Sequence, residues 1–542
     1  MIRPSILPDP APAVPHCLAT PPCPSRPGRR PARVRRAAAY LALATCIGLA
    51  GCAVGPDYVR PAVDTGLAYK EAAGQAVVPG WKPAQPANAD AASAWWRVYD
   101  DPELDSLMAR LNEANLDIAQ AEANYRQAQA LVRGARSALY PNVGVSGGVS
   151  RAGAGSGDSG TGSRVNNTYS LTGSVSWEVD LWGSVRRNIE ASRAGAQASA
   201  ADLAAARLSA QSALAQNYFQ LRVLDEHARL LTETVAAYQR SLQLTTNRYE
   251  VGVAPKSDVS VALTQVENTR ASLIDLQWQR GQLEHAIAVQ IGTTPAAFSL
   301  PPQPFALRIP QIPLGLPSQL LERRPDVAGA ERRTAQANAQ IGIAQAAWFP
   351  DLTLSADGGF RSGQFAQWLT APARFWSLGP ILAQTIFDGG LRDAQIASAR
   401  AGYDAQVAGY RQVVLGALRE VEDYLIQLRV MADEQAVQRR ALQAARESLQ
   451  LTRNQYEAGL VDFLDVAQLQ AAALNTERTA ISLLGDRLTA SVRLITALGG
   501  GWDGNLDAVA RGNANTTTES AAPAPVDASG AAVRAPATEA RQ

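Results

Sequence analysis

Few residues in this chain of 542 have the chemistry needed to catalyse a reaction or to hold a metal ion. The histidines are His16, His227 and His285, and all four cysteines lie within the first 52 residues. This distribution leaves no cysteine-based metal site or disulfide framework in the body of the chain. His227 stands among charged residues of a predicted helix, which favours a solvated helix face over a ligand site, and no H-E-x-x-H spacing occurs. We predict no catalytic residue, no metal site, no cofactor and no enzymatic activity.

One glycine pattern matches a nucleotide-binding motif, but its surroundings do not fit. Residues 155–160 read GSGDSG, which satisfies G-x-G-x-x-G. In dinucleotide-binding proteins that pattern follows a strand and opens a helix, whereas here it joins two predicted strands. We interpret it as an external loop. The 50 basic and 49 acidic residues nearly balance, which also argues against a nucleic-acid partner.

The first 52 residues have the features of an export signal that ends in a reactive cysteine. Basic residues 26–36 precede an apolar run at 37–50, and Leu49-Ala50-Gly51-Cys52 follows as a cleavage site. The run of about 14 residues is too short for a membrane-spanning helix. L-A-G-C resembles the lipobox of bacterial lipoproteins, in which the cysteine is acylated and becomes the first residue. We therefore predict a signal peptide at 1–51 and a lipidated Cys52. An ordinary cleavage site with an incidental cysteine is the alternative.

Two halves of the chain repeat one order of elements. LTTNRYEVGVAPKSDV at 244–259 recurs as LTRNQYEAGLVDFLDV at 451–466, and a period of about 207 residues indicates duplication. Each half is predicted to hold a helix, a strand pair, a very long helix and a shorter helix. The ranges are 103–139, 141–181, 185–250 and 258–290, then 325–347, 351–387, 392–457 and 465–497. The expected domains are an anchored N-terminal segment at 52–102, repeats at 103–299 and 325–499, a Pro-rich linker at 300–324, and a disordered tail at 500–542.

The long helices carry sustained heptads. About 65 residues at 1.5 Å each give roughly 100 Å, which is longer than a globular core is thick. Apolar side chains recur every seven residues, which indicates coiled-coil packing. The seams of the first half hold Leu203, Ala210, Leu224, Leu231 and Tyr238, and Leu214, Leu221, Ala228, Val235, Leu242 and Tyr249; the second half has Val414, Val421, Leu428, Leu442, Leu449 and Tyr456.

Residues 169–180, YSLTGSVSWEVD, alternate between apolar and polar side chains, with aromatic residues near both ends. This pattern fits a strand with lipid on one side and water on the other, although the edge of a soluble sandwich is an alternative. The side chains predicted to face a water-filled lumen are Ser170, Thr172, Ser174, Ser176 and Glu178. The weakest of the four strands is expected at 375–387, where Pro380 interrupts the pattern.

Four membrane strands cannot close a barrel by themselves, because unpaired edge amides are costly in lipid. Two chains would give eight strands and three would give twelve, and a wet lumen favours three. The expected fold is therefore an α+β membrane protein: a homotrimer with a 12-stranded barrel above a tube of long helices.

The chain resembles outer membrane factors of the TolC/OprM class, in the NodT-type lipoprotein branch. The resemblance rests on segments spread over residues 52–499: AVGPDYVRP after Cys52, Trp95-Trp96, AQAEANYRQAQA at 119–130, the long segment 323–350 and IFDGG at 386–390. It implies a mixed equatorial belt, an outer-membrane location in a Gram-negative bacterium, and a passive exit duct for small molecules. It also implies a periplasmic adaptor and an inner-membrane transporter, of the RND type, as partners. The outlet of a type I protein secretion system and a periplasmic adaptor or structural lipoprotein are the alternatives.

Both long helices end in Y-E-x-G followed by an aspartate, at the end away from the strands. Asp258, Asp462 and Asp465 are candidate gate residues there, because threefold symmetry would turn one lumen-facing aspartate into a ring. In some members of the family an aspartate lies nine residues after the glycine, where this chain has Gln468. Helix N-capping by Asp258 and Asp465 is the alternative interpretation.

Overall fold

The computed structural model describes residues 53–66, 69–71, 94–154, 164–303, 309–310, 312, 323–502 and 504. The predicted signal peptide, Cys52, the GSGDSG loop, most of the linker and most of the C-terminal tail lie outside the described residues.

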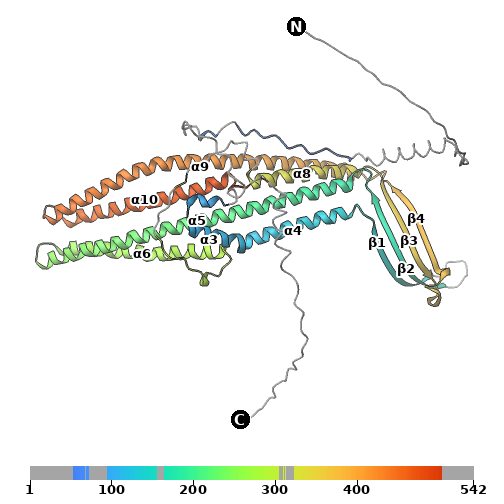
Figure 1. Ribbon diagram of the computed structural model, residues 1–542, viewed down its shortest axis with the longest axis horizontal. Helices are drawn as coiled ribbons and strands as arrows, with labels where there is room; N and C mark the ends of the chain where they lie inside the picture. The colour runs from blue at the N-terminus through green and yellow to red at the C-terminus, as the bar shows by residue number, and fades with distance from the viewer. Residues whose placement is uncertain are drawn as a thin grey trace, which may run out of the picture. The chain divides into compact units, whose positions relative to one another are not determined.

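Long helices lie side by side, and a sheet continues from one end of them (Figure 1). The helices α5 (Ser184–Glu250) and α9 (Leu391–Glu457) have 67 residues each, so each is about 100 Å long. Each is followed by a 35-residue helix, α6 (Lys256–Gln290) or α10 (Phe463–Ala497), which folds back along it. The helices α4 (Leu116–Ser137) and α8 (Pro325–Ala346) lead into the two strand pairs.

All but one of the predicted seam residues are buried or half-buried, as expected for packed helices. Fully or nearly fully buried positions include Leu203, Leu214, Leu221, Leu231, Tyr238, Val414, Val421 and Tyr456. Tyr249 is the exception, because 43% of its surface is exposed at the tip, so its predicted place in the seam is wrong.

The predicted helix at 103–139 is two helices, α3 (Pro102–Ala114) and α4. Asn115 separates them because its backbone is extended and its side chain accepts hydrogen bonds from the amides of Asp117 and Ile118, both at 3.0 Å. Its amide nitrogen also donates to the carbonyl of Gln290, at 2.8 Å. An asparagine cap thus ends one helix and starts the next.

Four antiparallel strands form one sheet in the order β1-β2-β3-β4. They are β1 (Asn142–Ala154), β2 (Arg164–Val179), β3 (Asp351–Ser362) and β4 (Arg374–Ala383). The last strand ends at Ala383, so the prediction that it runs to residue 387 is wrong. Pro380 lies within β4 opposite Leu354. In the described part of the chain β4 has one neighbouring strand, and a missing amide hydrogen is tolerated on such an edge strand.

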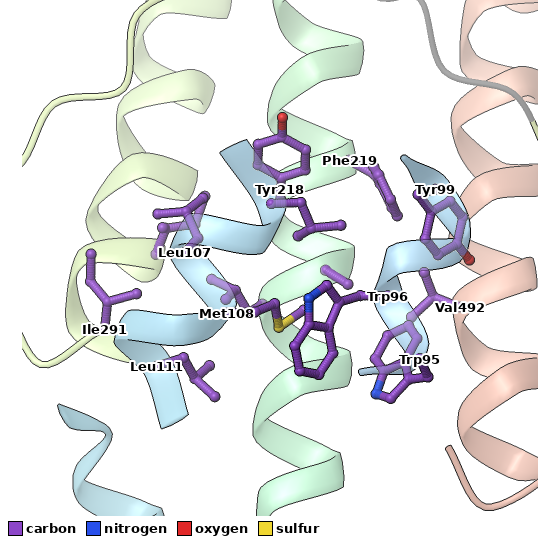
Figure 2. Close-up of a cluster of buried hydrophobic side chains, with 14 of the residues drawn as sticks. Trp95, Trp96, Tyr99, Leu107, Met108, Leu111, Tyr218, Phe219, Ile291 and Val492 are labelled. Carbon is purple, nitrogen blue, oxygen red and sulfur yellow. The ribbon is translucent and has the colours of Figure 1, made fainter. Parts of the chain in front are cut away.

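An aromatic core joins the middle of α5 to short elements near the N-terminus (Figure 2). The 3-10 helix η2 (Trp95–Tyr99) places Trp95, Trp96 and Tyr99 against α5 and α10. The ring of Tyr99 lies 4.8 Å from that of Phe219, and Trp95 donates to Gln211 at 3.1 Å. Leu104, Leu107, Met108 and Leu111 of α3 fill the rest of this cluster. This cluster holds the helical hairpins together midway along α5.

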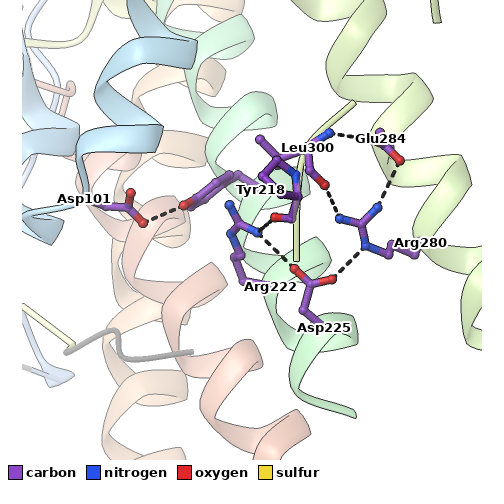
Figure 3. A network of polar contacts seen from close by, with 8 residues as sticks. Asp101, Tyr218, Arg222, Asp225, Arg280, Glu284 and Leu300 are labelled. Atoms are coloured by element: carbon purple, nitrogen blue, oxygen red, sulfur yellow. Dashed lines mark hydrogen bonds and ion pairs between the residues drawn. The ribbon is translucent and has the colours of Figure 1, made fainter. Parts of the chain in front are cut away.

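A buried polar network lies beside this core (Figure 3). Asp225 of α5 accepts from Arg222 at 3.0 Å and from Arg280 of α6 at 2.7 Å. Glu284 accepts from Arg280 at 3.0 Å and from the amide of Leu300 at 2.6 Å. The network therefore fixes α6 and the chain that follows it against α5.

His227 is buried, so its prediction as part of a solvated helix face is wrong. Only 6% of its surface is exposed, and its Nε2 lies 3.2 Å from Ser482 Oγ of α10. Burial lowers the pKa of His227, and the nearby charge of Arg478 adds to this effect. Sequence reasoning did not foresee this contact, because Ser482 lies 255 residues away in the chain.

Candidate functional site

The strand register sorts the side chains of all four strands onto two opposite faces of the sheet. Residues directly opposite each other share a face. The apolar face carries Val143, Val145 and Val149 of β1, Tyr169, Leu171, Val175 and Trp177 of β2, Leu354, Ala356 and Phe360 of β3, and Trp376, Leu378 and Leu382 of β4. Trp376 is 82% exposed and Val145 is 78% exposed. A continuous apolar face of this size needs lipid or a protein partner to cover it.

The opposite face is polar. The predicted residues Ser170, Thr172, Ser174, Ser176 and Glu178 lie opposite Arg361, Gly359, Asp357, Ser355 and Thr353, respectively. The structure thus places all five on one side of the sheet. That this side lines a lumen stays a prediction. Sequence reasoning missed Asp357 and Arg361, because the register between β2 and β3 joins segments about 180 residues apart.

Aromatic side chains gather at both ends of the sheet. At the far end, the Tyr169 ring lies 5.5 Å from that of Phe365 and 6.2 Å from that of Trp368. At the end next to the helices, Trp182 stacks on Phe349 at 4.7 Å. Eight residues separate Tyr169 from Trp177, or about 27 Å along the strand, which suits the apolar band of about 25 Å between the aromatic girdles of membrane barrels. None of the helices in the described part of the chain is both long and apolar enough to cross a membrane.

The residues that follow Cys52 are fixed at the junction between the sheet and the helices. The amide of Val54 donates to the carbonyl of Trp182 at 2.9 Å. The guanidinium of Arg187 donates to the carbonyls of Val54 and Gly55, at 3.2 and 3.1 Å. The Cα atom of Ala53 lies so close to Gly183 that a Cβ there would be 2.9 Å from it. The residues after Cys52 therefore lie next to the helix-side end of the sheet.

The tip aspartates do not cap their helices through their side chains. Asp258 and Asp465 are the third residues of α6 and α10, and the N-cap positions belong to Pro255 and Asp462. Neither N-cap residue makes a side-chain cap hydrogen bond. The capping interpretation of Asp258 and Asp465 is therefore wrong, since both helices begin earlier than expected. Whether these three aspartates form a gate stays a prediction.

The two tips pack against each other within one chain. The guanidinium of Arg248 donates to the carbonyl of Tyr456 at 2.9 Å and lies 4.5 Å from the centre of its ring. Gln265 of α6 donates to the carbonyl of Ala467 of α10 at 2.8 Å. Burial raises the pKa of Asp258, and the negative charge of Asp462 raises it further. Arg248 therefore holds the first and second hairpins together at their tips, whereas the negative charges of Asp258 and Asp462 repel each other there.

Comparison with known proteins agrees with this geometry. The model of the family described as "Outer membrane efflux protein" matches residues 107–293 and 316–500. Antibiotic efflux pump outer membrane protein ArpC of Pseudomonas putida is 32% identical over 465 residues, which are 84% of this chain and 94% of ArpC. Pyoverdine export outer membrane protein OpmQ of Pseudomonas aeruginosa is 31% identical over 478 residues, 86% of this chain and 98% of OpmQ.

Solved structures share the whole fold. The outer-membrane channel OprN is 30% identical, with a TM-score of 0.75 over 83% of this chain and 100% of its own. The MtrE outer membrane channel of Neisseria gonorrhoeae, in its open state, is 25% identical, with a TM-score of 0.72 over 84% of this chain and 100% of its own.

A two-faced open sheet on long paired helices defines the protomer of an outer-membrane channel. The chain belongs to the outer membrane efflux protein family. It is the outer-membrane channel of an efflux pump in Gram-negative bacteria, which confirms the predicted fold class, location and role. The same findings favour a channel over a periplasmic adaptor or structural lipoprotein, and efflux over protein secretion. The family is one of channels, and the described residues contain no cluster that could hold a metal ion.

Proposed function

We propose that the protein works as a homotrimer and is the passive exit duct of a tripartite efflux system. One observation carries this proposal. The sheet is open, and its edge strands β1 and β4 each have one partner in the described chain. Such edges cannot face lipid unpaired. Three copies would pair β4 of one with β1 of the next and form a 12-stranded barrel around the polar face.

An outer seam on α9 supports the same assembly. Gly402, Gly409 and Gly416 lie seven residues apart, and a Cβ on any of them would meet nothing within 4 Å. The same spacing continues through the exposed Asp423, which pairs with Arg419, to the exposed Val430, Val437 and Leu451. Exposed apolar residues on α6, at the other side of the chain, are Leu263, Ile274, Trp278 and Val289. A heptad seam that is unpartnered within one chain fits a helix of a second copy.

The cargo is a small molecule chosen by the inner partners. Relatives are named for antibiotics, toluene, pyoverdine and a cation, although each of them matches 84–86% of this chain. The polar face of β2 offers four small hydroxyl groups and Glu178 rather than a pocket shaped for one molecule, so it suits the passage of many different small molecules. We propose a periplasmic adaptor at the tips and an RND-type inner-membrane transporter as the partners that select and drive the cargo.

Cys52 is proposed as the lipidated first residue of the mature protein. Ala53 is held at the helix-side end of the sheet, which is where the inner leaflet of the outer membrane would meet the proposed barrel. Acyl chains on the preceding residue could enter that leaflet directly. Cys52→Ser should leave an uncleaved precursor without acyl chains, as seen by mass spectrometry of the intact protein. An unmodified Cys52 in the wild type would overturn this assignment.

The proposed role is tested in a Gram-negative strain that lacks its own outer-membrane efflux channel. The chain is expressed with the adaptor and transporter from its own genomic neighbourhood, and ethidium accumulation is measured. We expect accumulation to fall only when all three proteins are present. The adaptor and transporter without the channel serve as the control. Equal accumulation with and without the channel would refute the proposal.

A further inference from the structure

We infer that Asp357 and Arg361 of β3 form two charge-selective levels in the barrel, an acidic level and a basic level nearer the external mouth. This inference rests on the proposed trimer and its polar lumen. It assigns the specificity-determining charges of the barrel to residues outside the periplasmic tips.

The register places both charges on the polar face. Asp357 lies between Ser174 of β2 and Ser377 of β4, and Ser377 donates to its carboxylate at 3.4 Å. Arg361 lies opposite Ser170, and its guanidinium is 4.8 Å from the centre of the Phe375 ring. Among the described residues neither side chain has a partner in an ion pair. Both charges are therefore open to ions and cargo on that face.

The order of the levels follows from the chain connections. The helices α4 and α8 lead into the starts of β1 and β3, so the last residues of β1 and β3 lie at the far, external end of the sheet (Figure 1). Along β3 toward that end come Thr353, which faces Glu178, then Asp357, then Arg361. A permeating molecule would pass Glu178, then the acidic level at Asp357 and then the basic level at Arg361.

The levels are far enough apart to act separately. Four residues of a strand span about 13 Å, whereas charges are screened over about 8 Å at physiological ionic strength. Threefold symmetry makes each level a set of three like charges around the axis. We therefore expect cations to be enriched at the Asp357 level and anions at the Arg361 level. The stacking of Arg361 on Phe375 holds its charge along the wall.

The test measures local potential with single cysteines placed opposite each charge. Ser170→Cys faces Arg361, and Ser174→Cys faces Asp357, in intact outer membranes. The probes are anionic sulfonatoethyl and cationic trimethylammonioethyl methanethiosulfonate, whose rate ratio cancels the intrinsic reactivity of the thiol. A unit charge about 4 Å away in water should change each rate about fivefold. The anionic reagent should be faster at position 170 and the cationic reagent at position 174.

Removing the facing charge should abolish each preference. Arg361→Gln should bring the ratio of the two reaction rates at position 170 toward the ratio that the same reagents show with a small thiol in solution. Asp357→Asn should have the same effect at position 174. The matched control is Arg374→Gln, which deletes an arginine next to this level but on the apolar face, opposite Phe360. It should leave both ratios unchanged. The inference would be overturned if the rate ratios at positions 170 and 174 equalled those of a small thiol in solution. It would also be overturned if the charge preferences stayed unchanged in Arg361→Gln and Asp357→Asn.

A third cysteine separates this inference from the proposed function. Leu171→Cys lies on the apolar face and should resist both reagents if that face meets lipid. If Leu171→Cys reacts while Ser170→Cys and Ser174→Cys do not, the assignment of the lumen fails, and with it the proposed barrel. If positions 170 and 174 react without charge preference, only the charge levels fail.

Discussion

At the scale of single residues, Asp258 should make the packing of the two tips sensitive to pH. Its pKa is raised by burial and by Asp462, so the packed tip binds a proton more tightly than an open one. The stabilisation is fully present below the ordinary carboxyl pKa of about 4 and is lost as pH rises through the raised pKa. We expect resting single-channel conductance in planar bilayers to fall as the solution is acidified from neutral pH.

Asp462→Asn provides the matched variant for this prediction. It removes the neighbouring charge, so the pKa of Asp258 should fall and the pH dependence should shrink. Asp117→Asn, at the start of α4 and away from the tips, should leave the pH dependence as in the wild type. An unchanged profile in Asp462→Asn would show that the two carboxylates do not interact in the closed tip.

The buried Asp225 should be far more important for stability than a surface carboxylate. Its side chain is 3% exposed and pairs with Arg222 and Arg280. Asp225→Ala leaves the equally buried Arg222 uncompensated, which should cost about 3–5 kcal/mol. Glu233→Ala removes the exposed partner of Arg229 and should cost less than about 1 kcal/mol. Unfolding of the detergent-solubilised proteins followed by circular dichroism compares them, and equal losses would contradict the network.

At the scale of elements, Gly485 sets how closely α10 approaches α5. A Cβ at this position would overlap Cγ2 of Val223. Gly485→Ala should therefore destabilise the helix pair by about 1–3 kcal/mol through overpacking. Val223→Ala in the same chain removes the obstructing methyl groups and should restore most of the loss. A double-mutant cycle on the free energy of unfolding measures this coupling, and simple additivity would argue against the close approach.

The long elements could be predicted from sequence because their signals are local. The expected helix at 185–250 is found at Ser184–Glu250, since its heptads, interrupted only at Asn217, continue almost to a tip where Gly252 adopts a φ of 75°. Because the second half repeats the sequence pattern of the first, the same reasoning predicts a helix at 392–457, and the structure has it at Leu391–Glu457. The cap at Asn115 was missed because apolar periodicity continues on both sides of it, and capping depends on a single side chain.

The site was predicted only on the strand whose pattern is complete. Ser170 to Glu178 lie on one face, as β2 alternates strictly, whereas glycines and Pro380 interrupt the pattern of β3 and β4. The positions of Asp357 and Arg361 depend on the register between distant strands, and the burial of His227 depends on α10. Such contacts between segments far apart in sequence leave no mark in local periodicity.

At the scale of the whole molecule, the exposed seam of α9 should decide whether chains associate. Val437 is 55% exposed within one chain and belongs to the outer heptad seam. Val437→Asp would bury a charge in the proposed contact between copies and should shift the protein from trimer to monomer. Leu451→Met, a volume-conserving change in the same seam, should keep the trimer. Native mass spectrometry of the detergent-extracted protein reports the distribution, and an intact trimer of Val437→Asp would exclude this seam from the interface.

The central claim is that three copies close one continuous conduit through the outer membrane. Electron cryomicroscopy of the lipidated protein in lipid nanodiscs tests it most directly. We expect a threefold particle with a 12-stranded barrel, with Ser170, Ser174 and Asp357 lining its lumen and Val145 and Trp376 facing lipid. A dimeric eight-stranded barrel, an open four-stranded sheet, or a barrel with the polar face toward lipid would contradict this account.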